Sequence, residues 1–98
     1  MICTVGIWTA KEGREHEFAH RWEESVDSLI LEYPDLRFRL LRDQSDPRRF
    51  VSLGEGWRTS EQVEELRSLP SFQDAMTSIW RVLESGEMST FELAVEIS

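Results

Sequence analysis

The two histidines of the chain, His16 and His20, stand four residues apart, which is the spacing of a metal-binding pair on one helix face. Glu23 and Asp27 lie close enough in helical angle to join them. The apolar residues of the same segment define its buried face, however, and they turn both histidines toward solvent. Two ligands on an open helix face, with no cysteine or second histidine pair beside them, make a poor metal site. We therefore expect a solvated helix face and no bound metal.

The sequence lacks the motifs of nucleophilic catalysis and nucleotide binding. The single cysteine, Cys3, lies in an apolar run without an obvious base, and no Gly-x-Ser-x-Gly sequence occurs. The one glycine-rich run, Gly54-Glu55-Gly56, has neither the spacing nor the helix start of a dinucleotide-binding fingerprint. Its carboxylate would also repel a phosphate. Both classes of site are disfavoured, and Cys3 is expected to be a buried, reduced thiol.

Carboxylates and arginines on the predicted strands could carry charge-based chemistry. Glu55, Glu92 and Glu96 lie on two of these strands, and Arg37 and Arg39 lie on another. If the side chains share one side of a sheet, they can pair across strands or between two copies of the chain. The simpler interpretation is a set of ion pairs that fixes register or an interface. The alternative is an arginine that orients a substrate, with an acid close by.

The best indication of a binding pocket is a shortage of bulk on two strands. Thr4 and Gly6 share one face of the first strand, and Ser52, Gly54 and Gly56 share one face of the third. Glycine in a strand often marks the close approach of a ligand or of another backbone. Larger side chains could cover or flank this space, namely Trp22, Phe38, Phe72, Met76 and Trp80. The pattern predicts an apolar pocket for a small aromatic molecule, although the same side chains could simply fill the gap.

The composition of the 98-residue chain fits one globular domain over residues 1–98, with 40% hydrophobic residues. The net charge of −8 disfavours nucleic acid and anionic membranes as partners, because both are bound by clustered lysine and arginine. No apolar segment approaches the ~20 residues of a spanning helix, and no leader sequence precedes the first strand. We therefore expect a cytoplasmic protein that does not bind membranes.

The elements that would position these residues follow a β-α-β-β-α-β order. Residues 2–9 indicate a strand that is apolar on both faces and therefore central in its sheet. The other predicted elements are a helix over 15–33, a hairpin of strands 36–41 and 49–57, helices over 60–68 and 71–85, and a strand over 88–97. Hydroxyl caps are expected at Thr59 or Ser60 and at Ser71, and Gly86 is expected to end the last helix.

This order predicts an α+β fold of the ferredoxin-like type, with one antiparallel sheet and helices on one of its faces. The first strand is apolar on both sides, so the other face of the sheet needs a cover. A second copy of the sheet is the economical cover, and we expect a two-fold homodimer.

The chain resembles the antibiotic biosynthesis monooxygenase family of small dimeric α/β-barrel proteins. The resemblance rests on a strand ending in Trp57, a polar helix start at Ser60-Glu61, a short helix, and then Leu69-Pro70-Ser71-Phe72. Further matches lie upstream: Phe18-x-x-x-Trp22, the turn at Pro34, and the strand end Leu40-Leu41-Arg42-Asp43. It implies a ferredoxin-like protomer and a homodimer whose sheets form a barrel. It also implies oxidation of an aromatic or polyketide-like substrate by O₂ without a metal, flavin or nicotinamide cofactor.

A branch of the same superfamily degrades heme and holds the iron with a histidine four positions after the residue that matches Phe72. That position is Met76 in this chain, and Leu66 stands where the branch has a tryptophan on the short helix. A thioether alone is a poor iron anchor compared with histidine. Both departures argue against heme degradation.

A cofactor-free oxygenase needs a substrate that can form a carbanion or phenolate, held away from water, with a base or cation to stabilise the charge. Under this resemblance, Trp22 and Trp57 are candidate pocket walls, and Arg37 or Arg39 is the candidate charge stabiliser. No histidine is placed to act as the base. Two alternatives stay open, a module that binds a ligand without transforming it and a structural homodimer with a filled core.

Overall fold

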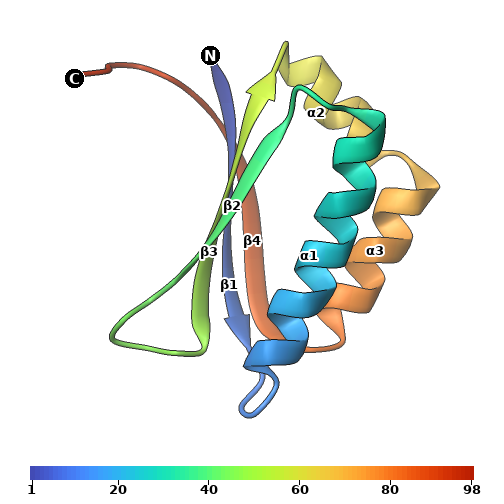
Figure 1. Ribbon diagram of the computed structural model, residues 1–98, viewed down its shortest axis with the longest axis vertical. Helices are drawn as coiled ribbons and strands as arrows, with labels where there is room; N and C mark the ends of the chain where they lie inside the picture. The colour runs from blue at the N-terminus through green and yellow to red at the C-terminus, as the bar shows by residue number, and fades with distance from the viewer.

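The computed structural model describes residues 1–98 and contains one antiparallel sheet with three helices on one face (Figure 1). The elements are β1 (Ile2–Ala10), α1 (Glu15–Glu32), β2 (Arg37–Arg42), β3 (Arg49–Trp57), α2 (Ser60–Arg67), α3 (Pro70–Trp80) and β4 (Leu83–Glu92). The sheet order is β2-β3-β1-β4, with every neighbouring pair antiparallel. The ferredoxin-like βαββαβ fold, the hairpin and the central position of the first strand are confirmed. Within one chain the sheet is open, with β2 and β4 at its edges.

The alternation of β1 assigns its side chains to the two faces of the sheet. Thr4, Gly6 and Trp8 lie on the face that carries the helices, and they stand opposite Gly54, Ser52 and Phe50 of β3. The intervening residues, among them Val5 and Ile7, belong to the face that no helix covers. The same register places Phe38 of β2 beside Gly54. The small residues of β1 and β3 therefore meet at the middle of the covered face.

A bulge near the end of β3 brings Trp57 onto the covered face. The β1–β3 register shifts between Ile2 and Thr4, and Gly56 has a φ of 94°, in the left-handed region that favours glycine. A Cβ at Gly56 would lie 2.1 Å from the carbonyl oxygen of Asp35. Glycine is therefore required at position 56 both by its backbone conformation and by the close approach of the neighbouring chain.

The helices begin and end for different local reasons. The Thr59 hydroxyl caps α2 by accepting a hydrogen bond from the Gln62 backbone N–H at 3.1 Å. The predicted cap at Ser71 is wrong, because α3 already starts at Pro70, whose fixed φ suits the first helical turn. None of the three helices has the length and apolar character needed to cross a membrane.

The boundary between α3 and β4 differs from the prediction. We expected a helix to Ser85 and a strand from Met88, but α3 ends at Trp80 and β4 starts at Leu83. The cause is β1, whose whole length pairs with β4 from Ala10–Leu83 to Ile2–Glu92. Gly86 is therefore a strand residue and not a helix cap; a Cβ there would lie 2.5 Å from the Trp8 indole.

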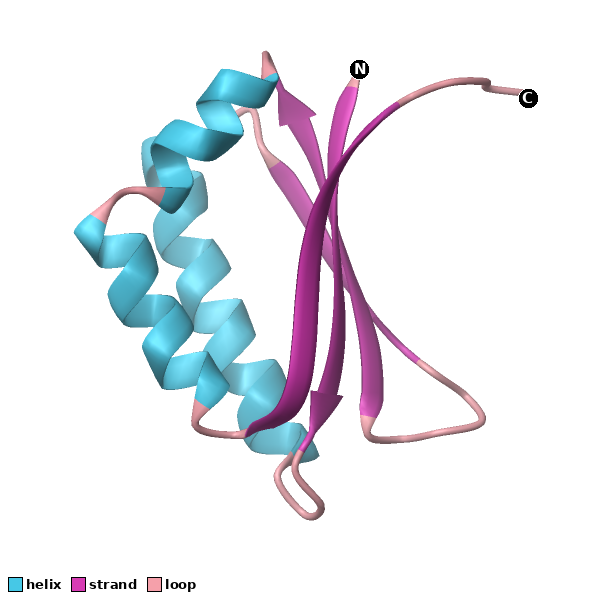
Figure 2. Cartoon of the chain, turned by 180° about the vertical axis from the view of Figure 1, so that it is seen from behind, coloured by secondary structure: helices cyan, strands magenta, loops and turns pink.

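The residues after β4 leave the sheet as a tail (Figure 2). The predicted strand to Ile97 is therefore too long, because β1 offers no partner beyond Met1, whose carbonyl accepts the last bond from Leu93 N–H at 2.8 Å. Phe91, Val95 and Ile97 are largely exposed.

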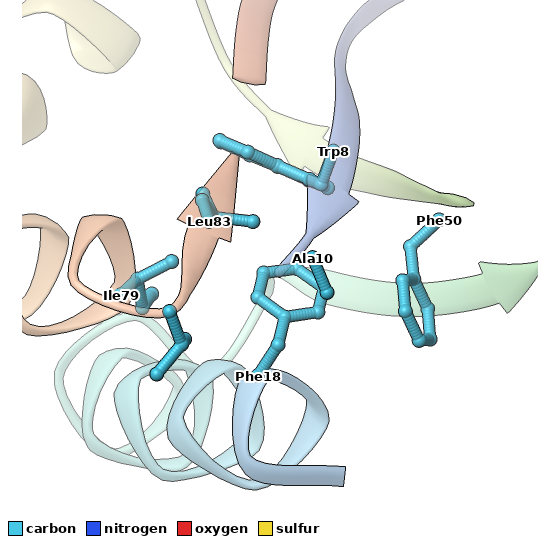
Figure 3. Close-up of a cluster of buried hydrophobic side chains, with 7 residues drawn as sticks. Trp8, Ala10, Phe18, Phe50, Ile79 and Leu83 are labelled. Atoms are coloured by element: carbon cyan, nitrogen blue, oxygen red, sulfur yellow. The ribbon is translucent and has the colours of Figure 1, made fainter. Parts of the chain in front are cut away.

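Two buried clusters hold the helices on the sheet. The larger one lies where β1 ends and α1 begins (Figure 3) and consists of Trp8, Ala10, Phe18, Phe50, Ile79, Val82 and Leu83. Its centre is aromatic, with the Phe18 and Phe50 ring centroids 5.0 Å apart. The smaller cluster lies under α2 and consists of Leu36, Trp57, Val63 and Leu66. The candidate site lies between these two clusters.

Candidate functional site

A cavity of about 450 Å³ lies between the middle of the sheet and helices α1 and α3. Its volume is that of a small-molecule site. Eight of the nine residues predicted to form a pocket line it: Thr4, Gly6, Trp22, Phe38, Ser52, Gly54, Phe72 and Met76. The ninth, Trp80, does not line the cavity, because it lies at the end of α3 and packs edge-on against Trp8 with ring centroids 6.4 Å apart.

The floor of the cavity is shaped by side chains that use the space over the glycines. A Cβ at Gly6 would lie 2.5 Å from both the Ser52 hydroxyl and the Trp8 indole. A Cβ at Gly54 would lie 2.3 Å from the Thr4 hydroxyl and 2.9 Å from the Phe38 ring. The glycines are thus required by neighbouring side chains of the protein, whereas the prediction was the close approach of a ligand or of another backbone.

Two indole–hydroxyl hydrogen bonds order this floor. The Trp8 Nε1–H donates to Ser52 Oγ at 2.9 Å, and the Trp57 Nε1–H donates to Thr4 Oγ1 at 3.2 Å. Both indoles are buried, so these bonds satisfy donors that would otherwise be costly to bury. Trp57 was predicted as a pocket wall, but it does not line the cavity; it lies behind Thr4 and holds that side chain in place.

The roof of the cavity bridges the two core clusters. Trp22 and Met76 pack against the larger cluster, whereas Phe72 packs against the smaller one. All three are only partly buried, because one side of each faces the cavity. Neither cluster extends far enough to fill the space between them.

Small and polar residues line the seam where α1 faces α3. Ser25 and Ser28 contribute from α1, and Ser71, Ala75 and Ser78 contribute from α3. Such short side chains cannot close the seam. These residues were not predicted from the sequence, although spacings of three and four place each set on one helix face beside the apolar stripe.

Arg21 is the most connected polar group at the cavity. Its guanidinium donates to the Ser78 carbonyl at 2.6 Å, to the Ser78 hydroxyl at 3.1 Å and to Glu17 Oε1 at 2.7 Å. The pKa of Glu17 is lowered to about 2, chiefly by the hydrogen bond from Arg14 and further by Arg21. Arg21 therefore ties α1 to α3 at one end of the seam.

The remaining charged residues of the cavity lining, Glu24 and Glu32, are exposed and belong to its rim. Glu24 pairs with His20 at 2.5 Å, and both side chains are largely in solvent. His16 is also exposed, and neither histidine lines the cavity. No three histidine, cysteine, aspartate or glutamate side chains gather in a metal-binding arrangement.

Arg37 and Arg39 lie on the opposite face of the sheet, where both approach Glu55, at 3.7 and 3.5 Å. β2 alternates, so Phe38 points to the cavity while the two arginines point away from it. The structure thus contradicts their predicted role as stabilisers of charge in the pocket. Glu92 and Glu96 make no ion pair, which leaves Glu55 as the one predicted carboxylate that joins the set.

Comparison with known proteins identifies the family. The family model for antibiotic biosynthesis monooxygenase matches residues 1–78 of the chain. No curated protein sequence matches it. Among solved structures, SnoaB from Streptomyces nogalater, described as a cofactor-independent oxygenase, has a TM-score of 0.84 at 18% identity over 98% of this chain and 95% of its own.

Two further structures have the same fold. A protein described as an antibiotic biosynthesis monooxygenase has a TM-score of 0.80 at 18% identity, over 97% of this chain and 100% of its own. A conserved protein from Methanosarcina mazei has a TM-score of 0.78 at 14% identity, over 92% and 89%. At these identities the structural similarity shows the fold alone, and the match to the family model over residues 1–78 shows the family. The chain belongs to the antibiotic biosynthesis monooxygenase family.

Proposed function

We propose that the protein is a cofactor-independent monooxygenase that oxidises a small aromatic or polyketide-like molecule in the cavity between the sheet and helices α1 and α3. The single observation that carries this proposal is the cavity itself, which has a volume of about 450 Å³ and is lined by Trp22, Phe38, Phe72 and Met76. An apolar, aromatic lining of this size suits a fused-ring ligand. Family membership supports the reaction type, and the description of SnoaB supports chemistry without a cofactor.

The reaction we propose converts a ring CH₂ flanked by aromatic rings into a carbonyl, with one O₂ consumed and one water released. The substrate first loses a proton and becomes an enolate or phenolate. This anion passes an electron to O₂, and the resulting radical and superoxide combine to a peroxide. The peroxide takes back the proton lost in the first step and becomes a hydroperoxide. Loss of the second CH₂ proton and of hydroxide from this hydroperoxide, which leave together as water, gives the carbonyl. One oxygen atom enters the product, and the other is reduced to water.

The protein's part in this scheme is to bind and shield the anion. An apolar cavity excludes water that would quench a reactive intermediate. The charged lining residues, Arg21, Glu24 and Glu32, all come from α1, and the two carboxylates lie at the exposed rim. A substrate that ionises readily would give up its proton to water or to one of these rim carboxylates.

The test is oxygen uptake with anthrone, a three-ring compound with one such CH₂. We expect uptake above the uncatalysed rate and formation of anthraquinone with one oxygen atom from ¹⁸O₂. Saturable quenching of tryptophan fluorescence without oxygen uptake would support the alternative, a module that holds its ligand unchanged. Neither binding nor uptake would leave a structural protein.

We also propose that two copies associate through the face of the sheet that no helix covers, as in a dimeric α/β barrel. Large apolar side chains are exposed on that face, among them Ile7 at 40%, Leu41 at 49% and Phe91 at 53%. An apolar surface of this kind is a common mark of a protein interface. Sedimentation should give twice the chain mass of 11.5 kDa. Ile7→Lys should give the single-chain mass, whereas Glu61→Lys on exposed α2 should not.

A further inference from the structure

The floor of the cavity carries two hydroxyl groups with an unusual hydrogen-bonding arrangement. Thr4 on β1 and Ser52 on β3 both line the cavity. Each hydroxyl oxygen accepts a hydrogen bond from a tryptophan indole, Trp57 in the first case and Trp8 in the second. Neither hydroxyl donates to another protein group. Each therefore keeps its own proton free.

The direction of these bonds fixes what the hydroxyls can offer a ligand. An indole N–H donates and never accepts, so each hydroxyl oxygen must be the acceptor of its pair. The hydroxyl proton then points away from the indole. Accepting a hydrogen bond also polarises the O–H group and makes it a better donor. The cavity floor thus presents two O–H donors, and the indoles already occupy one acceptor site on each hydroxyl oxygen.

Both hydroxyls are held in position by indole partners that are themselves tightly packed. The Trp8 side chain is 2% exposed, and its indole lies against Gly6 and Gly86, where a Cβ would approach within 2.5 Å. Trp57 is 7% exposed and packs edge-on against Phe38 with ring centroids 6.1 Å apart. Donors fixed in this way need no rearrangement to stabilise a charge, which is the requirement for an oxyanion-binding site.

No cation lies on the floor to take over this role. The charged residues that line the cavity are Arg21, Glu24 and Glu32, all on α1 and none on the sheet. The Arg21 guanidinium is already hydrogen-bonded to Ser78 and Glu17. An anionic oxygen that reaches the floor between the aromatic walls therefore meets two hydroxyl groups and no cation.

We propose that Thr4 and Ser52 form a two-donor site that binds the ionised oxygen of an aromatic ligand, a phenolate or an enolate, and so favours the ionised form in the cavity. The ligand class rests on the proposed function. The site contributes no bond-making step, since the ligand's proton leaves to solvent and the hydroxyls keep theirs. This would explain how the ligand is activated although no histidine lines the cavity.

The test uses 2-naphthol, whose ionised form has its own absorbance band, and naphthalene as the matched probe without oxygen. The pH midpoint of ionisation of bound 2-naphthol is measured in the wild type, Thr4→Val, Ser52→Ala and Thr4→Ser. We expect each hydroxyl-deleting variant to raise the midpoint by about one pH unit, equivalent to about tenfold weaker binding of naphtholate. Thr4→Ser should behave as the wild type, and naphthalene affinity should stay the same in all four proteins.

An unchanged midpoint in Thr4→Val and Ser52→Ala would overturn the proposal, as would a failure of 2-naphthol to bind the wild type. Circular dichroism checks that each variant folds; Thr4→Val, which keeps the side-chain shape, decides the matter if Ser52→Ala does not fold. Oxygen uptake with anthrone separates this proposal from the proposed function. Equal uptake by wild type and both variants would refute the donor site and leave the oxygenase intact. Hydroxyl-dependent naphtholate binding without any uptake would support the donor site and refute the oxygenase.

Discussion

The layer between sheet and helices is closed at one end and open in its middle, although the same elements build both regions. At the closed end, Trp8, Phe18 and Phe50 pack ring against ring, with centroids 5.0 to 6.2 Å apart. In the middle, Trp22 lies on α1 like Phe18, and Phe72 lies on α3, yet both face a cavity of about 450 Å³. The seam between α1 and α3 contributes to the difference, because short side chains such as those of Ser25 and Ala75 line the middle there.

The comparison teaches that an aromatic stripe does not by itself distinguish a core from a pocket. Phe18 and Trp22 are neighbours on one face of α1, four residues apart. Phe18 is fully buried, while Trp22 is partly buried at the cavity. We interpret the closed end as the source of stability and the open middle as the source of binding, and the predictions below test that division.

The largest expected effect is on stability at the closed end. Phe18→Ala should lower the free energy of unfolding by about 3–5 kcal/mol, because it removes a fully buried ring and leaves a void. Chemical denaturation measures this loss. Trp22→Ala should cost clearly less, since part of that side chain already faces empty space. Equal losses would contradict the division into two regions.

The next effect is on ligand affinity in the middle. Trp22→Ala should weaken the binding of an aromatic ligand such as 2-naphthol by about tenfold or more, beyond any effect on folding. Trp22→Phe, which keeps an aromatic wall, is the matched control and should retain most of the affinity. Fluorescence of the remaining tryptophans follows the titration. Unchanged affinity in Trp22→Ala would place the ligand elsewhere.

The connection at the end of the seam should have a smaller effect. Arg21→Met removes two hydrogen bonds from α1 to Ser78 of α3 and one to Glu17 within α1, while keeping much of the side-chain length. We expect faster amide hydrogen exchange in α3 and a stability loss of about 1–2 kcal/mol, because the partners of Arg21 remain partly solvated. Exchange in β1 and β3, which carry Trp8 and Phe50 of the closed end, should not change. A change confined to β1 and β3 would contradict the role of Arg21 as the connection between α1 and α3.

The smallest effect is a pH dependence in the acid range. The pKa of Glu17 lies at about 2 in the folded protein, below its ordinary value of 4.5, mainly because of the hydrogen bond from Arg14. A lowered folded pKa stabilises the protein above pH 4.5, and this contribution is lost as the pH falls from about 4.5 toward 2. The ion pair is partly solvent-exposed, so the loss should be slight. Glu17→Gln should flatten the stability profile in that window, and a profile identical to wild type would refute the assignment.

Much of the site followed from local patterns in the sequence. The alternation of β1 and β3 placed Thr4, Gly6 and Ser52 on one floor, and the stripe of α1 placed Trp22 above it. These features depend only on the periods of strands and helices. Whether the space between floor and helices stays open depends on the distance between the helices. The periodic patterns of strands and helices do not determine that distance.

Two features were missed for long-range reasons, and one error was local. Val82 and Leu83 continue the helical spacing of α3. The Lys11 N–H donates to the Val82 carbonyl, however, and Leu83 pairs with Ala10 at the end of β1, so a strand starts at Leu83. Arg21 stands beside the apolar stripe, and its partner Ser78 is 57 residues away. Arg37 and Arg39 were assigned to the pocket although Phe38 lies between them, and alternation requires Phe38 and the arginines to face opposite ways. The last error was avoidable from the sequence.

The most direct test of the central claim is to fill the cavity without disturbing either core cluster. Ala75→Phe on α3 places a ring into the open space, whereas Gln73→Phe places the same ring on the exposed side of the same helix. The rate of oxygen uptake with anthrone is then compared in the wild type and both variants, with their unfolding midpoints as the check on folding. We predict that Ala75→Phe remains folded and loses uptake, while Gln73→Phe retains it. Uptake by Ala75→Phe at the wild-type rate would contradict the claim that the oxidation takes place in this cavity.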